Sequence, residues 1–263
     1  MNTDTKTTTD KSNTIQKLFE VGAHFGFTKR RRHPTVVPYL YGTKDGNDIF
    51  DLEKTADQIE EVAALLEEWA KLGKTVMYVG TKDEIKHIVE RSAMAVDSPY
   101  VINRWIGGVL TNFSEIKKRI KRLLDLEAEQ AAGTLDRKYT KKERVILGRE
   151  MTKLRFNFGG VVSLVRPPDA MVVVDPRHEF IAVEEAKQLG IPVVGILSSD
   201  VNVSDVTHPI VMNDSLLGSV TYVLERLVEA QKKGAAAYVV PAATNDRSKG
   251  RTTRPTITRT RTA

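Results

Sequence analysis

The sequence contains no cysteine, and no run of apolar residues is long enough to span a membrane. The absence of Cys among the 263 residues excludes disulfides and thiolate zinc sites. A membrane span needs about 18 or more apolar residues in a row. The polar start MNTDTKTTTDKSN also lacks the apolar stretch of a secretory signal. We therefore expect a cytoplasmic protein without a membrane partner.

Motifs of nucleotide and metal chemistry are missing as well. After the apolar run TVMYV the sequence continues GTKDEIK, which has one glycine where a dinucleotide fold needs G-x-G-x-x-G. A phosphate contact by Thr81 or Lys82 and a magnesium site at Asp175, Asp200 and Asp205 are alternatives. Ordinary turns and helix caps explain these residues more simply. We expect no enzyme, no cofactor, no bound metal and no small-molecule substrate.

Positive charge is concentrated in two segments of the chain. Residues 114–155 contain 13 Lys and Arg against 7 Asp and Glu, and residues 241–263 contain 6 against 1. The rest of the chain is mildly acidic, although the net charge is +6. Segregation of this kind indicates a polyanionic partner.

Short runs rich in Val and Ile alternate with amphipathic stretches. Strands are predicted at 75–80, 99–102, 170–175 and 191–197, and helices at 14–22, 53–72, 83–95, 179–189 and 214–232. This alternation predicts an α/β fold with a doubly wound parallel sheet, Rossmann-like or flavodoxin-like, with helices on both faces. Residues 36–52 contain TKDG between two apolar runs, which predicts a β-hairpin.

A segment between the strands has a different apolar period. Phe113, Ile116, Ile120 and Leu123 are followed, after a polar turn, by Leu147, Met151, Leu154 and Phe158. Spacings of three and four are typical of a narrow coiled-coil seam. Two such helices joined by a turn predict an antiparallel hairpin. We expect a disordered N-terminus at 1–13, an α/β domain at 14–112 and 156–233, an inserted hairpin at 113–155 and a disordered basic tail at 234–263.

An ordered series of motifs resembles one known family. The motifs are His24-Phe25-Gly26 with Arg30-Arg31 and Pro34; Arg104-Trp105-Ile106-Gly107-Gly108 with Leu110-Thr111-Asn112-Phe113; Tyr139-Thr140-Lys141-Lys142-Glu143; and Gly159-Gly160 with Leu189-Gly190-Ile191-Pro192-Val193. Over residues 14–233 this series closely resembles the bacterial small-subunit ribosomal protein S2 family.

The resemblance implies a structural constituent of the small ribosomal subunit that supports translation and subunit assembly and is not an enzyme. The implied partners are the small-subunit (16S) rRNA and neighbouring small-subunit proteins, including ribosomal protein S1. The chain departs from the family pattern at Phe27, Thr28 and Lys29, which replace His, Gln and Thr. Arg32 and His33 replace Trp and Asn, so an aromatic is lost and cations are gained.

Basic residues outside the predicted sheet are our candidates for RNA contact, because phosphate contacts supply most of the affinity for RNA. We predict contacts from Lys29, Arg30, Arg31, Arg32, His24, Arg104, Lys117, Lys118, Lys121, Arg122, Lys141, Lys142, Arg247, Arg251, Arg254, Arg259 and Arg261.

Other roles are open for several of these regions. Packing suits Trp105 better than base stacking, and Asn112 suits a helix cap better than base reading. The arm cations would also suit an adaptor that binds protein instead of RNA, and the loop and tail cations could simply be solvated.

Overall fold

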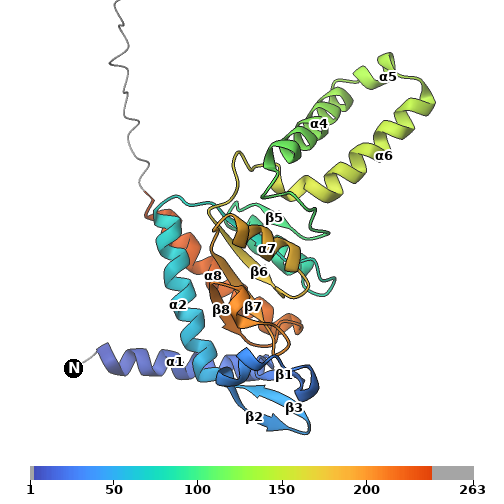
Figure 1. Cartoon of the computed structure of the whole chain (residues 1–263). Coiled ribbons are helices and arrows are strands. Elements are labelled where there is room, and N and C mark those ends of the chain that lie inside the picture. The colour runs from blue at the N-terminus through green and yellow to red at the C-terminus, as the bar shows by residue number, and fades with distance from the viewer. Residues whose placement is uncertain (1–2, 239–263) are drawn as a thin grey trace, which may run out of the picture.

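The computed structural model describes residues 3–238, and its centre is a parallel five-stranded sheet (Figure 1). The strands are β4 (Val76–Val79), β5 (Tyr100–Val101), β6 (Ala170–Val174), β7 (Val193–Leu197) and β8 (His208–Val211). Their spatial order is β5-β4-β6-β7-β8, with every pair parallel. This is the flavodoxin-like order of doubly wound sheets, so the predicted fold class is confirmed.

Alternate residues of the strands enter two separate hydrophobic cores. Val76 and Tyr78 belong to one core, and Met77 and Val79 to the other. Burial on both faces explains why the strands are apolar throughout instead of alternating with polar residues.

Helices cover both faces of the sheet. One face is covered by α2 (Leu52–Lys71), α3 (Lys86–Met94) and α8 (Leu217–Ala236), and the other by α7 (Phe180–Gln188). The Asp51 carboxylate starts α2 by accepting a hydrogen bond from Glu53 N at 3.1 Å. Within residues 3–238, no helix is both long and apolar enough to cross a bilayer.

A small antiparallel sheet lies at one end of the molecule (Figure 1). It consists of β1 (Phe25–Thr28), β2 (Leu40–Lys44) and β3 (Asn47–Phe50). Asp45 and Gly46 join β2 to β3 with φ values of 51° and 80°, as a tight hairpin turn requires. The predicted hairpin is present. The first half of the expected first run is instead part of a 3-10 helix, Pro34–Tyr39, because Pro34 and Pro38 fix φ and cannot donate to a ladder. The second half of the run lies in β2.

The N-terminal helix differs from the prediction. Helix α1 spans Thr3–Glu20, whereas residues 1–13 were expected to be disordered. Lys11 forms an ion pair with Asp57 of α2 at 2.6 Å, and Leu18 is fully buried. The apolar end of the helix is therefore anchored in the core, and the polar residues before it continue the helix.

A helical arm stands between β5 and β6 and projects from the sheet (Figure 1). It comprises α4 (Phe113–Ala131), α5 (Thr134–Lys138) and α6 (Lys141–Phe158). The predicted seam residues are buried or partly buried, so a helical hairpin is present. At its root, Gly160 packs so closely on Tyr100 that an added Cβ would lie 2.3 Å from the Tyr100 carbonyl oxygen.

Candidate nucleic-acid interface

The basic loop at residues 29–33 is fixed between the small sheet and the large one. Lys29–Arg31 forms a 3-10 helix. Lys29 N donates to Gly46 O at 3.0 Å, and His33 N donates to Ser199 O at 2.8 Å. The loop is therefore tied both to the β2–β3 turn and to the segment after β7.

The four consecutive cations of the loop have different environments. Arg32 donates from Nε to Asp48 Oδ2 at 2.8 Å and from its terminal nitrogen to Asp48 Oδ1. Asp48 is fully buried, and its hydrogen bond raises the pKa of Arg32. Arg32 thus compensates a buried carboxylate, and we assign it a mainly structural role.

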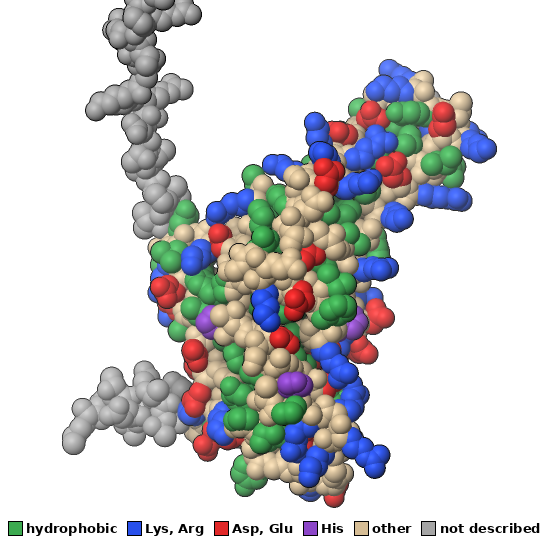
Figure 2. Space-filling model, viewed as in Figure 1, with side chains coloured by type: hydrophobic (Ala, Val, Ile, Leu, Met, Phe, Trp, Pro, Cys, Tyr) green, Lys and Arg blue, Asp and Glu red, His purple; other side chains and the backbone are tan. Residues whose placement is uncertain are grey.

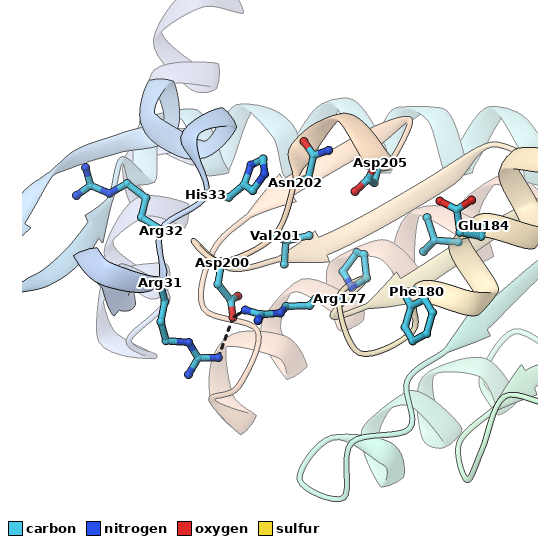
Figure 3. A pocket seen from close by; sticks show the side chains of 12 residues that line it. Arg31, Arg32, His33, Arg177, Phe180, Glu184, Asp200, Val201, Asn202 and Asp205 are labelled. Atoms are coloured by element: carbon cyan, nitrogen blue, oxygen red, sulfur yellow. Dashed lines mark hydrogen bonds and ion pairs between the residues drawn. The ribbon is translucent and has the colours of Figure 1, made fainter.

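Arg31 shares an acidic partner with a residue that the sequence analysis missed. Asp200 Oδ2 accepts from Arg31 at 3.0 Å and from Arg177 at 2.5 Å (Figure 3). The Arg31 guanidinium also lies 4.4 Å from the centroid of the Phe27 ring. Two guanidinium groups on one carboxylate leave an excess positive charge and several free N–H donors. The only sequence signal for Arg177 was its place after a strand, at the edge where loops gather.

Lys29 and Arg30 are the cations of this loop that can bind a partner molecule. Both are exposed, and neither side chain has an ion-pair partner among residues 3–238. Adjacent like charges repel unless a polyanion or solvent screens them. The exposed cations of the loop thus lie beside the pair formed by Arg31 and Arg177.

His24 is placed differently from the other predicted contacts. Its ring stacks on Phe19 at 4.4 Å between centroids and lies 3.9 Å from Phe25. Burial lowers the pKa of His24, so it is neutral near pH 7. It therefore adds no positive charge to the surface. Arg104, by contrast, is exposed.

The arm is spatially separate from the loop (Figures 1 and 2). Lys118 is paired with Glu115 at 2.6 Å, and Arg122 with Glu150 at 3.4 Å. The remaining predicted arm contacts are exposed and have no ion pair within the described part of the chain: Lys117, Lys121, Lys141 and Lys142. Figure 2 shows Lys and Arg along the arm with Asp and Glu among them. The predicted tail contacts from Arg247 to Arg261 lie outside the described residues.

A buried carboxylate at the root of the arm was also missed. Glu185 of α7 accepts hydrogen bonds from Trp105 Nε1 at 3.1 Å, Gly108 N at 2.7 Å and Leu110 N at 3.0 Å, and from both N and Oγ1 of Thr111 at 3.1 Å. Burial alone would raise the pKa of Glu185, but these hydrogen bonds outweigh it and lower the pKa. Trp105 is therefore a packing residue, 7% exposed, as predicted.

Asn112 precedes α4 as expected, although its side chain makes no capping hydrogen bond to the helix backbone. The first turn of α4 is instead connected to the preceding loop through backbone hydrogen bonds.

The sheet edge where a doubly wound fold binds ligands is filled by internal contacts. Lys82 Nζ lies 2.5 Å from Asp175 and 3.6 Å from Asp214. Thr81 N donates to Glu179 at 3.0 Å. Burial, together with the nearby charge of Asp175, raises the pKa of Asp214 to about 6. The side chains considered for a phosphate contact thus have internal partners.

The three aspartates considered for magnesium also face cations. Asp175 contacts Lys82, Asp200 contacts Arg31 and Arg177, and Asp205 lies 3.5 Å from Lys187. Within residues 3–238, no group of three or more His, Asp or Glu side chains is arranged to hold a metal ion.

Comparison with curated proteins gives the class to which this chain belongs. It is 39% identical over 220 residues to the small ribosomal subunit protein uS2 of Parabacteroides distasonis, covering 84% of this chain and 79% of the relative. It is 38% identical to uS2c of Rhodomonas salina, covering 84% and 90%. With uS2 of Micrococcus luteus the identity is 36%, covering 85% and 79%. The relatives are components of the small ribosomal subunit.

The family follows from a second comparison. The family model described as Ribosomal protein S2 matches residues 18–234. The chain belongs to the ribosomal protein S2 family, as the sequence motifs predicted. This is a family of structural ribosomal proteins and not of enzymes.

Proposed function

We propose that this chain binds small-subunit rRNA as a structural constituent of the small ribosomal subunit, in the cytoplasm. The observation that carries the proposal is the arrangement of Lys29 and Arg30 beside two arginines that share one carboxylate. The side chains of Lys29 and Arg30 are exposed and have no ion-pair partner in the part of the chain that the structure describes. Phosphate groups are the ligands that such a surface favours.

Each cationic region has a distinct part in this proposal. The backbone of the basic loop is held by hydrogen bonds, so little backbone entropy is lost when its cations bind phosphates. Lys117 and Lys121 lie four residues apart on α4 and form a row on one side of the arm. The tail arginines add phosphate contacts.

Neighbouring proteins of the small subunit are the second class of partner. The names of the relatives assign them to that subunit, where proteins and RNA adjoin. We propose contacts with these neighbours, including ribosomal protein S1, and with neither membrane nor small-molecule substrate. Through both classes of contact the chain supports subunit assembly and translation.

Rebinding to small-subunit particles that lack this protein tests the proposal. The full chain is expected to comigrate with the particles on a sucrose gradient, with an affinity that falls as salt rises. Lys29→Ala combined with Arg30→Ala should weaken binding and reduce the slope of log K against log salt by about 1 to 2.

The matched control replaces two exposed lysines near the start of β4, Lys74 before that strand and Lys232 in α8. Their replacement by Ala removes the same charge, so equal weakening by the two double variants would show that only net charge matters. Absence of salt-sensitive binding by the unmodified chain would refute RNA binding.

A further inference from the structure

A cavity of about 410 Å³ opens between the three helices of the arm. Its apolar lining comes from α4, α5 and α6: Leu126 is buried, and Leu135, Leu147 and Met151 are partly buried. The size is within the range of about 300–1,000 Å³ that is typical of ligand pockets. We call this cavity the tip notch.

The notch is open because α6 has a glycine where a larger side chain would fill it. A Cβ at Gly148 would meet no heavy atom within 4 Å. Gly148 lies in the interior of α6, where glycine lowers helix stability relative to alanine. No left-handed φ at Gly148 requires it. Backbone conformation therefore does not explain why position 148 is a glycine.

The rim combines positive charge with exposed apolar surface. Lys141 lines the notch and is exposed, whereas Arg144, also in the lining, already has a partner within the chain. None of the acidic side chains that the structure describes belongs to the lining. Val145, also in the lining, is 51% exposed. An apolar floor with a cationic rim is complementary to a ligand that has an apolar group flanked by negative charge.

The notch faces away from the basic row on α4. Lys117 and Leu126 are nine positions apart, as are Lys121 and Gln130, which also lines the notch. Nine residues correspond to about two and a half turns of an α-helix, so the members of each pair lie on opposite sides of α4. The arm thus has one side suited to phosphates and another with an apolar cavity.

We propose that the tip notch binds an apolar side chain from a protein segment that also carries acidic residues. Protein is favoured over RNA because the floor offers aliphatic surface and no aromatic ring on which a base would stack. The acidic residues of the segment pair with Lys141. The proposal rests on the proposed function only in that the partner is a neighbour on the small subunit.

Photo-crosslinking from Thr152 on assembled small subunits tests the proposal. Thr152 is exposed and lies one turn after Gly148 on the same face of α6. With the photoreactive residue benzoylphenylalanine at 152, we expect a crosslink to a peptide that contains both apolar and acidic residues. The same group at Lys121 should crosslink to rRNA, which tests the proposed function separately.

Two substitutions at Gly148 make the test specific to the notch. Gly148→Met fills the cavity and raises helix propensity, so the melting temperature should not fall while the Thr152 crosslink decreases at least about tenfold. Gly148→Ala gives a similar gain in helix propensity with little filling, and the crosslink should persist.

A crosslink from Thr152 only to rRNA, no crosslink at all, or one that Gly148→Met leaves unchanged would each overturn the proposal. Loss of the crosslink in the Gly148→Met variant, with normal comigration of that variant on gradients, would support it.

Discussion

The basic loop and the arm are both rich in Lys and Arg, but their charges are held in different ways. In the loop, Arg32 is bound to a fully buried aspartate, and Arg31 to one that is only 5% exposed. In the arm, the pair between Arg122 and Glu150 is exposed on both sides. Buried pairs fix geometry and are costly to break, whereas exposed pairs contribute little. The ion pairs of the loop therefore fix the positions of Arg31 and Arg32, whereas the charged side chains of the arm can change their positions at little cost in free energy.

Among the charged sites, the largest expected effect lies where the arm joins the body. Glu185→Ala would leave up to five donors without their acceptor, each of which costs free energy when buried. We expect a loss on the order of 3 kcal/mol in the free energy of unfolding, measured in urea. Glu185→Gln, which keeps an acceptor, should lose less. Equal losses for the two variants would show that the side-chain oxygen is unimportant.

A pH effect of similar or smaller size is expected at the carboxyl edge of the sheet. The pKa of Asp214 is raised in the fold to about 6 from 3.8. The folded state therefore binds the proton more tightly, and stability falls as pH rises from about 4 to 6. Asp214→Asn should remove this dependence and become more stable relative to the unmodified chain by about 2–3 kcal/mol across that interval. Unfolding at a series of pH values would show whether the two curves diverge in this direction or stay parallel.

Within the loop, replacing Arg32 should reduce stability clearly more than replacing Arg31. Arg32→Ala leaves Asp48 buried without its ionic partner and should cost about 2–3 kcal/mol. Arg31→Ala leaves Asp200 paired with Arg177 and should change stability by less than about 1 kcal/mol. Thermal unfolding of the two variants tests the comparison. Similar melting temperatures would contradict the structural role given to Arg32.

The smallest effect is expected in the arm. Glu150→Ala removes an ion pair exposed on both sides and should cost less than about 0.5 kcal/mol. Leu123→Ala, in the buried seam, is the matched control in the same hairpin and should cost about 2–5 kcal/mol. If the two changes had equal effects in urea unfolding, the contrast between exposed charges and buried seam would be wrong.

The sequence was sufficient for the elements that have strong local patterns. The strands at β4, β6 and β7 and the seam of the arm followed from apolar spacing alone. The pattern failed at β8, where His208 and Pro209 interrupt an otherwise short apolar run. It predicted the second part of α1 but missed the part before Thr14, because the polar residues there carry no apolar period.

Site prediction was limited for a different reason. Four adjacent cations look equivalent in a sequence. Only the fold shows that two of them form ion pairs, Arg32 with Asp48 and Arg31 with Asp200. Arg177 and Glu185 were missed because their partners are at least 23 residues away in the chain. Long-range pairing of this kind leaves no local spacing to detect.

The position of the arm between β5 and β6 has a consequence for the order of folding. Strand β4 pairs with both β5 and β6, so the sheet cannot be completed until the chain has passed through the whole arm. The contacts of the arm itself are between helices close in sequence, which form quickly. During synthesis, we therefore expect the hairpin to be folded while the sheet is still incomplete. The chain that leaves its second helix then returns to the sheet, where β6 pairs with β4.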